Sequence, residues 1–195
     1  MAVGMREKWK IPVSYHLTRG LTADQQKTLI ICAIDALQEQ NIQVRVVTFD
    51  GAATNVATAK KLGCNYEADQ YSFQYEGRHI FVTLDACHML KVLRNCLGDM
   101  YMLRTQDGVV CWEYIKQLVQ VQEMGELHMA NKITKRHIYY KEQIMKVKLA
   151  AQVFSQSTAD ALVTLCGCDI YPEFLGVGPT VTFLKVSVDM FKFYS

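Results

Sequence analysis

The chain has 195 residues, of which 50% are hydrophobic and 21% are charged, and its formal net charge at pH 7 is +2. This composition is typical of a globular protein and excludes a disordered, collagen-like or low-complexity chain. No apolar run reaches the roughly 18 residues that a membrane-spanning helix needs, and the N-terminus has no apolar stretch of a secretory signal. The seven cysteines are odd in number and scattered, so we expect reduced thiols rather than a disulfide framework.

Strand and helix signals alternate over the first half of the chain. The patterns predict strands over residues 13–17, 44–49 and 79–84, and helices over 22–41, 55–62 and 87–97. Thr22 is the expected N-cap of the first helix, with Gln25 as its capping-box partner. Gly63 is expected to close the second helix, and Lys91 and Arg94 to lie on the exposed side of the third. The alternation predicts a mixed α/β sheet.

The pattern changes after Gly98. Asp107-Gly108 is a turn signal between two short apolar stretches, and the chain beyond it has mostly helical spacing. We expect helices over residues 112–123, 138–154 and 157–165, and a last amphipathic stretch after a break at 176–179. Ser157 is the expected N-cap of the helix at 157–165. The sequence therefore predicts an α/β domain over residues 1–98 and a mainly α-helical domain over 99–195.

Two of the predicted strands end in an aspartate, Asp50 and Asp85. Ligands of open α/β sheets gather beyond the carboxyl ends of the strands, where a carboxylate can bind Mg²⁺ together with phosphate. Gly51 leaves room for a ligand to approach the backbone closely. The alternative is structural, because Asp-Gly is a common turn former and Asp85 can cap the helix that follows it. The pattern alone leaves both readings of Asp50 open.

Residues 132–148 form the most basic stretch of the chain, with six Lys or Arg side chains against one Glu. Such a stretch can bind phosphate or a nucleotide, or it can form a solvated helix face. The chain has no GxxxxGK[ST] loop, which excludes a nucleotide site of the P-loop kind. We expect His88 to be a packing residue, and Cys166 and Cys168 to be ordinary thiols rather than zinc ligands.

Four blocks occur in order along nearly the whole chain: Gly4–Pro12, Thr48–Asn55, Asp85–Asn95 and Met145–Thr158. Together they resemble the P-element family of DNA transposases, which includes the THAP-domain transposase-like proteins of animals. The resemblance implies an RNase H-like domain interrupted by a mainly helical GTP-binding insertion domain. It also implies cleavage and joining of DNA at transposon ends with Mg²⁺, by in-line attack of water or a 3′-hydroxyl on a phosphodiester.

The resemblance assigns roles to individual residues. Asp50 matches the second catalytic, metal-binding aspartate of the family. Lys132, Lys146 and Val147 match residues of the guanine-nucleotide site, where a lysine can meet phosphate charge and a valine can contact the base. Asp85 is expected to support the helix or the domain junction rather than catalysis.

The chain also departs from the family pattern. The first catalytic aspartate is expected upstream of the Gly4–Pro12 block and the catalytic glutamate beyond the insertion domain, so this chain lacks both, as it lacks the zinc-coordinating THAP domain and the oligomerising coiled coil. In the stretch that resembles the guanine-reading helix, Val188 and Lys192 stand where the family has Asn and Asp. A shift of register by one would place Asp189 near the site.

The expected function is therefore that of a transposase fragment with an incomplete RNase H-like sheet, inactive by itself. The alternative is a non-catalytic nucleotide- or nucleic-acid-binding module derived from a transposase. For the intact family, the resemblance implies Mg²⁺ and GTP as cofactors, transposon-end DNA as a partner, homo-oligomers and a nuclear location. No membrane association is expected.

Overall fold

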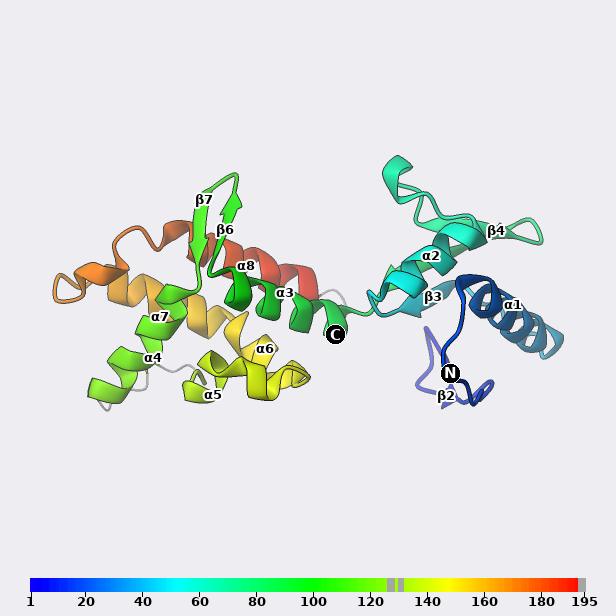
Figure 1. The fold of residues 1–195 in the computed structure, drawn as a ribbon, viewed down its shortest axis with the longest axis horizontal. Helices are drawn as coiled ribbons and strands as arrows, with labels where there is room; N and C mark the ends of the chain where they lie inside the picture. The colour runs from blue at the N-terminus through cyan, green and yellow to red at the C-terminus, as the bar shows by residue number, and fades with distance from the viewer. Residues whose placement is uncertain (126–128, 130–131, 193–195) are drawn as a thin grey trace. The chain divides into compact units, whose positions relative to one another are not determined.

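The computed structural model describes residues 1–125, 129 and 132–192 (Figure 1). The chain divides into two compact units, Met1–Asp85 and Ala86–Ser195. Each unit has its own hydrophobic core, one around Phe73 and Ile80 and the other around Trp112. The helix that follows Asp85, Ala86–Met100, belongs to the second unit, so the domain boundary predicted at residue 98 lies within this helix.

The first unit contains a small mixed sheet. Its elements are β1 (Ala2–Val3), β2 (Lys10–Ile11), α1 (Ala23–Glu39), β3 (Val46–Phe49), α2 (Ala53–Leu62), the 3-10 helix η1 (Tyr66–Ala68), β4 (Ser72–Tyr75) and β5 (Arg78–Leu84). The strand order of the three-stranded sheet is β3-β5-β4, with β3 parallel and β4 antiparallel to β5. This arrangement confirms the predicted mixed α/β sheet, while β1 and β2 form a separate antiparallel pair.

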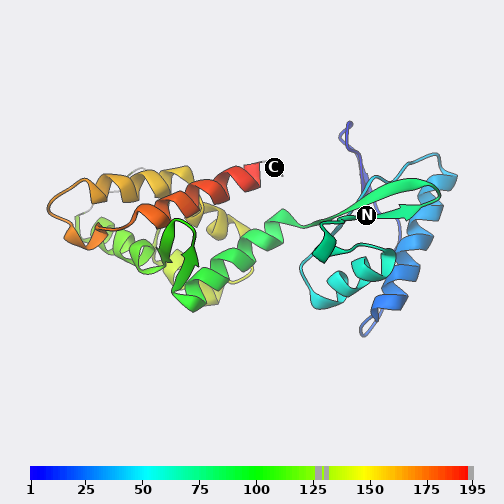
Figure 2. The ribbon, with the colours of Figure 1, turned by 90° about the horizontal axis from the view of Figure 1, so that it is seen from above.

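Helices α1 and α2 cover one face of this sheet (Figure 2). Ile34 of α1 and Ala59 of α2 share a core with Ile80 of β5. On the other face, Phe81 pairs with Val46 and is 54% exposed. The helices therefore bury the side of the sheet that carries Ile80 and leave the side that carries Phe81 largely exposed.

The predicted N-cap of α1 and the predicted ends of α1 and α2 are confirmed, whereas α2 begins at Ala53, two residues before the predicted start at residue 55. The Thr22 hydroxyl accepts a hydrogen bond from the Gln25 backbone N–H, and the Gln25 side chain accepts one from the Thr22 backbone N–H. Asn41, just beyond α1, and Gly63, just beyond α2, both have positive φ, at 58° and 124°. Positive φ after the last turn is the usual way in which a helix ends.

The expected strand over residues 13–17 is wrong, because these residues form no regular element. Tyr15 and Leu17 are 82% and 86% exposed, and an alternating pattern makes a strand only where another strand pairs with it. By contrast, β4 is a strand where the sequence patterns predict none. Pairing with β5 buries Ser72 and Phe73 there, although the residues around them are mostly polar.

The second unit is mainly helical. Its elements are α3 (Ala86–Met100), β6 (Met102–Thr105), β7 (Gly108–Cys111), α4 (Glu113–Gly125), α5 (Lys135–Ile138), the 3-10 helix η2 (Tyr140–Gln143), α6 (Val147–Val153), α7 (Gln156–Cys166), the 3-10 helix η3 (Pro172–Phe174) and α8 (Gly178–Lys192). Helices α7 and α8 lie side by side (Figure 2). The predicted turn at Asp107-Gly108 joins β6 to β7 as a hairpin, with Gly108 at a φ of 129°.

The single helix expected over residues 138–154 is wrong, because α5, η2 and α6 replace it. The cause lies in a side chain from α3. Arg94 Nη2 lies 3.4 Å from the carbonyl oxygen of Gln143 and 3.0 Å from that of Ile144. In a continuous helix these two oxygens would accept from the backbone N–H groups four residues later. Arg94 takes that place at Ile144, whereas the Gln143 oxygen also accepts from the Lys146 backbone N–H at 3.0 Å. Lys146 itself has an extended backbone instead of a helical one.

Two further expectations in this unit are wrong. Arg94 is fully buried rather than exposed, because it lies one helical turn from Leu90 and Leu97 on the buried face of α3. The N-cap of α7 is Ser155 rather than Ser157, and its hydroxyl accepts from the backbone N–H of Thr158 at 3.3 Å.

Candidate metal and nucleotide sites

Asp50 directly follows β3, at the carboxyl end of the strand, and its side chain is exposed. Its Oδ1 atom accepts a hydrogen bond from the backbone N–H of Ala52 at 3.0 Å and from the side-chain amide of Asn55 at 2.5 Å. These contacts orient the carboxylate over the start of α2. The turn-forming role and a ligand-binding role are therefore compatible at this residue.

The carboxylates of Asp50 and Asp85 follow two neighbouring parallel strands. The register pairs Phe49 with Leu84, and the Asp85 backbone N–H donates to the Phe49 carbonyl oxygen at 2.6 Å. Both aspartates therefore follow strand ends at the same edge of the sheet. Asp85 is half-buried and immediately precedes α3, which suits the supporting role expected for it.

A magnesium site needs few protein ligands, because Mg²⁺ keeps several waters and uses one or two carboxylates together with substrate phosphate. Asp50 fits as one such carboxylate. Within the described residues, no group of three or more His, Cys, Asp and Glu side chains is placed to hold a metal ion. His88 is half-buried, and no disulfide joins any two cysteines in the part of the chain that the structure describes.

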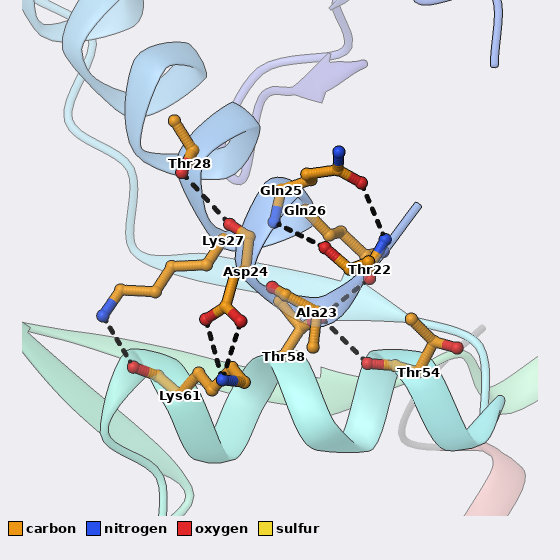
Figure 3. A network of polar contacts seen from close by, with 10 residues as sticks. All are labelled: Thr22, Ala23, Asp24, Gln25, Gln26, Lys27, Thr28, Thr54, Thr58 and Lys61. Atoms are coloured by element: carbon orange, nitrogen blue, oxygen red, sulfur yellow. Dashed lines mark hydrogen bonds and ion pairs between the residues drawn. The ribbon is translucent and has the colours of Figure 1, made fainter. Parts of the chain in front are cut away.

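Polar contacts join the first turns of α1 to α2 (Figure 3). Lys61 pairs with Asp24 at 2.7 Å, and the Lys27 ammonium donates to the carbonyl oxygen of Lys61 at 2.8 Å. The Gln26 side chain bonds to Thr58 and to Asn55, which in turn contacts Asp50. Nothing in the sequence pattern indicated these contacts, because they depend on the packing of α1 against α2.

In the second unit, Lys132 and Lys146 line the same pocket, which has a volume of about 330 Å³. Arg136 and Lys148 also line it, and the described lining residues include no carboxylate. Four cations around one cavity fit a polyphosphate anion. Val147 is half-buried at the start of α6, between two lining residues, but does not itself line the pocket.

His137 closes the inner side of this pocket. Its Nδ1 atom accepts from the Thr134 backbone N–H at 3.0 Å, and its Nε2 atom lies 3.0 Å from the Gln152 side-chain oxygen. Both contacts are satisfied by a neutral ring that carries its proton on Nε2. Burial lowers the pKa of His137, and the positive charge of Arg94 adds to the lowering.

Arg94 is a residue whose importance the sequence analysis missed. Its guanidinium lies over the Tyr140 ring at 5.2 Å and holds the chain just before Lys146, while its buried Nη1 atom has no hydrogen-bond partner among the described residues. The signal that could have found it is the helical period, because Leu90, Arg94 and Leu97 share one face of α3.

The residues that resemble the guanine-reading stretch lie on α8. Val188 is half-buried and Asp189 is exposed. The side chain of Lys192 lies outside the described residues. No residue of α8 is among the described lining residues of the pocket.

Comparison with known proteins identifies both units. Residues 1–63 match the family model of the TNP-like RNase H N-terminal domain, and residues 87–195 match that of the TNP-like GTP-binding insertion domain. Human DNA transposase THAP9 is 30% identical over 200 residues, which cover 100% of this chain and 22% of that protein. The Drosophila melanogaster transposable element P transposase is 24% identical over 161 residues, which cover 82% of this chain and 21% of that protein.

The fold agrees with these matches. A solved structure described as the Drosophila P element transposase strand transfer complex superposes with a TM-score of 0.82 at 23% identity, over 97% of this chain and 42% of that chain. The chain spans about a fifth of the length of the two relatives. These matches show that the chain belongs to the TNP-like family, to which the two family models over residues 1–63 and 87–195 assign it.

Proposed function

We propose that this chain contributes one metal-binding carboxylate and a guanine-nucleotide pocket to a DNA transposase of the P-element type. The observation that carries the first part is the place of Asp50, at the carboxyl end of a parallel strand in an RNase H-like fold. The substrate is transposon-end DNA in the nucleus, and the active assembly is a homo-oligomer. The described residues contain no helix with the length and apolar character to cross a membrane.

Asp50 is the residue of this chain that would hold Mg²⁺. Bound Mg²⁺ supplies charge stabilisation of the entering and leaving oxygens when a phosphodiester is attacked in line. The chain itself orients the Asp50 carboxylate through the Ala52 backbone N–H and the Asn55 side-chain amide. A two-metal reaction needs further carboxylates, so we expect the 195 residues alone to leave DNA uncut.

Incubation of the purified chain with supercoiled plasmid and Mg²⁺ or Mn²⁺ tests this expectation. The expected result is no nicking by the wild-type chain or by Asp50→Asn. Metal-dependent nicking that Asp50→Asn abolishes would show that the chain assembles an active site by itself. Binding of Mn²⁺ at Asp50, seen as paramagnetic broadening of the Gly51 amide signal, tests the ligand role directly.

The second function, nucleotide binding without catalysis, is favoured by the four cations around the 330 Å³ pocket. Titration with a fluorescent GTP analogue is expected to show binding that Lys132→Ala and Lys146→Ala each weaken about tenfold, which corresponds to one lost charge-assisted contact. Lys91→Ala removes a cation from α3, outside the pocket, and is the matched control. Equal affinity of the wild type and all three variants for the GTP analogue would contradict this function. Displacement of the analogue by GTP, compared with displacement by ATP, measures selectivity for the base.

A further inference from the structure

Four side chains form a continuous series of hydrogen bonds that ends at Asp50, and we call it the Asp50 network. The Thr58 hydroxyl lies 2.8 Å from Gln26 Oε1, Gln26 Nε2 lies 2.5 Å from Asn55 Oδ1, and Asn55 Nδ2 lies 2.5 Å from Asp50 Oδ1. Gln26 belongs to α1, whereas Asn55 and Thr58 belong to α2. The network therefore links the packing of two helices to one carboxylate.

The direction of the network is fixed by the carboxylate. An ionised Asp50 can only accept, so the nitrogen of Asn55 must face it and the oxygen of Asn55 must face Gln26. The nitrogen of Gln26 then faces Asn55, and its oxygen is left to accept from the Thr58 hydroxyl. Every donor points toward Asp50, and neither amide can turn over without placing two like groups together.

Burial makes the far end of the network rigid. Thr58 is fully buried, and Gln26 and Asn55 are half-buried, whereas Asp50 itself is exposed. The Thr58 hydroxyl also lies 2.8 Å from the carbonyl oxygen of Thr54 and 3.4 Å from that of Ala23, so its single proton is shared among three acceptors. The link from Thr58 to Gln26 is therefore the weakest of the three.

We propose that Asn55, held in turn by Gln26 and Thr58, is a positioning residue that keeps the Asp50 carboxylate in one orientation for its ligand. The inference rests on the proposed function, in which that ligand is Mg²⁺. Asp50 Oδ1 also accepts from the Ala52 backbone N–H, but loss of the Asn55 contact lets the exposed carboxylate exchange between rotamers, which lowers the fraction of molecules whose carboxylate is oriented for its ligand. Partners behind a metal ligand typically change metal affinity by about 10- to 100-fold.

The first experiment measures the orientation of Asp50 without metal. Three-bond couplings from Asp50 Cγ to its backbone N and carbonyl carbon give the χ1 populations in the full chain. We expect one dominant rotamer in the wild type and in Thr58→Ser, averaged rotamers in Asn55→Ala and Gln26→Ala, and a smaller change in Thr58→Val. The backbone amide spectrum of each variant shows whether it is folded.

Asn65→Ala is the matched control. Asn65 accepts from the Glu67 backbone N–H at the start of η1, so its loss removes an asparagine contact of similar kind outside the Asp50 network. It is expected to leave the Asp50 couplings unchanged. Unchanged couplings in folded Asn55→Ala would overturn the proposal, whatever its effect on thermal stability.

The second experiment is a Mn²⁺ titration of the same proteins, read from broadening of the Gly51 and Ala52 amide signals. We expect Asn55→Ala to weaken Mn²⁺ binding about tenfold or more, and Asn65→Ala to leave it unchanged. Averaged rotamers together with unchanged Mn²⁺ affinity would reduce the network to a structural role and overturn the proposal. If the wild type shows no broadening, the proposed function fails, and the couplings still decide whether Asn55 orients Asp50.

Discussion

At the scale of single residues, Arg94 decides the conformation of a distant segment. It is fully buried, and it donates to the carbonyl oxygen of Ile144 at 3.0 Å and, more weakly, to that of Gln143, which also accepts from the Lys146 backbone N–H. A buried polar group left without a hydrogen bond costs about 1–3 kcal/mol. The guanidinium therefore supports the bend that brings Lys146 to the pocket.

We expect Arg94→Ala to lower the free energy of unfolding by about 2–4 kcal/mol, because it removes the hydrogen bond to the carbonyl oxygen of Ile144 and opens a cavity. Lys91→Ala, on the same helix but only half-buried, is expected to change it by less than about 0.5 kcal/mol. Urea unfolding followed by circular dichroism measures both. Equal decreases in the free energy of unfolding for the two substitutions would show that the buried contacts of Arg94 contribute little to stability.

His137 makes stability depend on pH. Its folded-state pKa is lowered by burial, so the unfolded chain binds more protons than the folded one below the ordinary histidine value of about 6.5. Stability is therefore full above this value and falls as the pH drops through it toward the folded pKa. The neutral ring also matches the hydrogen bonds that Thr134 and Gln152 make with it.

The unfolding free energy of the wild type is expected to fall between pH 7.5 and pH 5.5. His137→Gln keeps a neutral polar side chain, so its decrease over the same interval should be smaller. His16→Gln replaces an exposed histidine and serves as the control. Its unfolding free energy is expected to fall with pH as that of the wild type does. Parallel curves for all three proteins would contradict the role of His137.

At the scale of elements, caps fix where the helices of the second unit begin. Ser155 and Ser157 are both suitable N-caps by residue type, and they stand two positions apart. The structure selects Ser155, whose hydroxyl accepts from the Thr158 backbone N–H, while Ser157 lies in the first turn of α7. The choice follows from the sharp end of α6 at Val153, which leaves Ser155 extended.

Ser155→Ala is expected to lower the unfolding free energy by about 1 kcal/mol, the usual value of a lost N-cap. Ser157→Ala should cost less than about 0.5 kcal/mol, because Ser157 does not cap the helix. The two variants differ only in position, so each is the control of the other in urea unfolding. A larger loss in Ser157→Ala would contradict the observed cap.

At the scale of the whole molecule, the chain holds two cores in separate units. The core of the second unit includes Trp112, Ile115, Leu118 and Leu162, all almost fully buried. A compact unit with its own core is able to fold independently. The match of residues 87–195 to one family model agrees with this division.

We expect residues 86–195, produced alone, to fold and to unfold cooperatively in urea. Leu162→Ala in this fragment is expected to cost about 2–5 kcal/mol, the usual range for a leucine removed from a core. Agreement of its amide spectrum with that of the full chain is the control for a native fold. A fragment without a cooperative transition would contradict an independent second unit.

Much of the chain could be predicted from local signals. The α1 capping box at Thr22, the end of α2 at Gly63 and the turn at Gly108 depend on neighbouring residues alone, and all three are confirmed. The assignment of Asp50, Lys132, Lys146 and Val147 came from family resemblance, and their roles stay predictions. The pocket does bring Lys132 and Lys146 together.

The sequence by itself determined the order of most helices and strands, the mixed sheet and the family. Tertiary structure alone decided that residues 13–17 form no strand, that Arg94 turns inward and breaks the helix expected at 138–154, and that Gln26 of α1 reaches Asp50 through Asn55. The physical reason is the separation along the chain between the groups that interact. Caps and turns are satisfied within a few residues, whereas strand pairing and buried polar contacts depend on groups that only folding brings close.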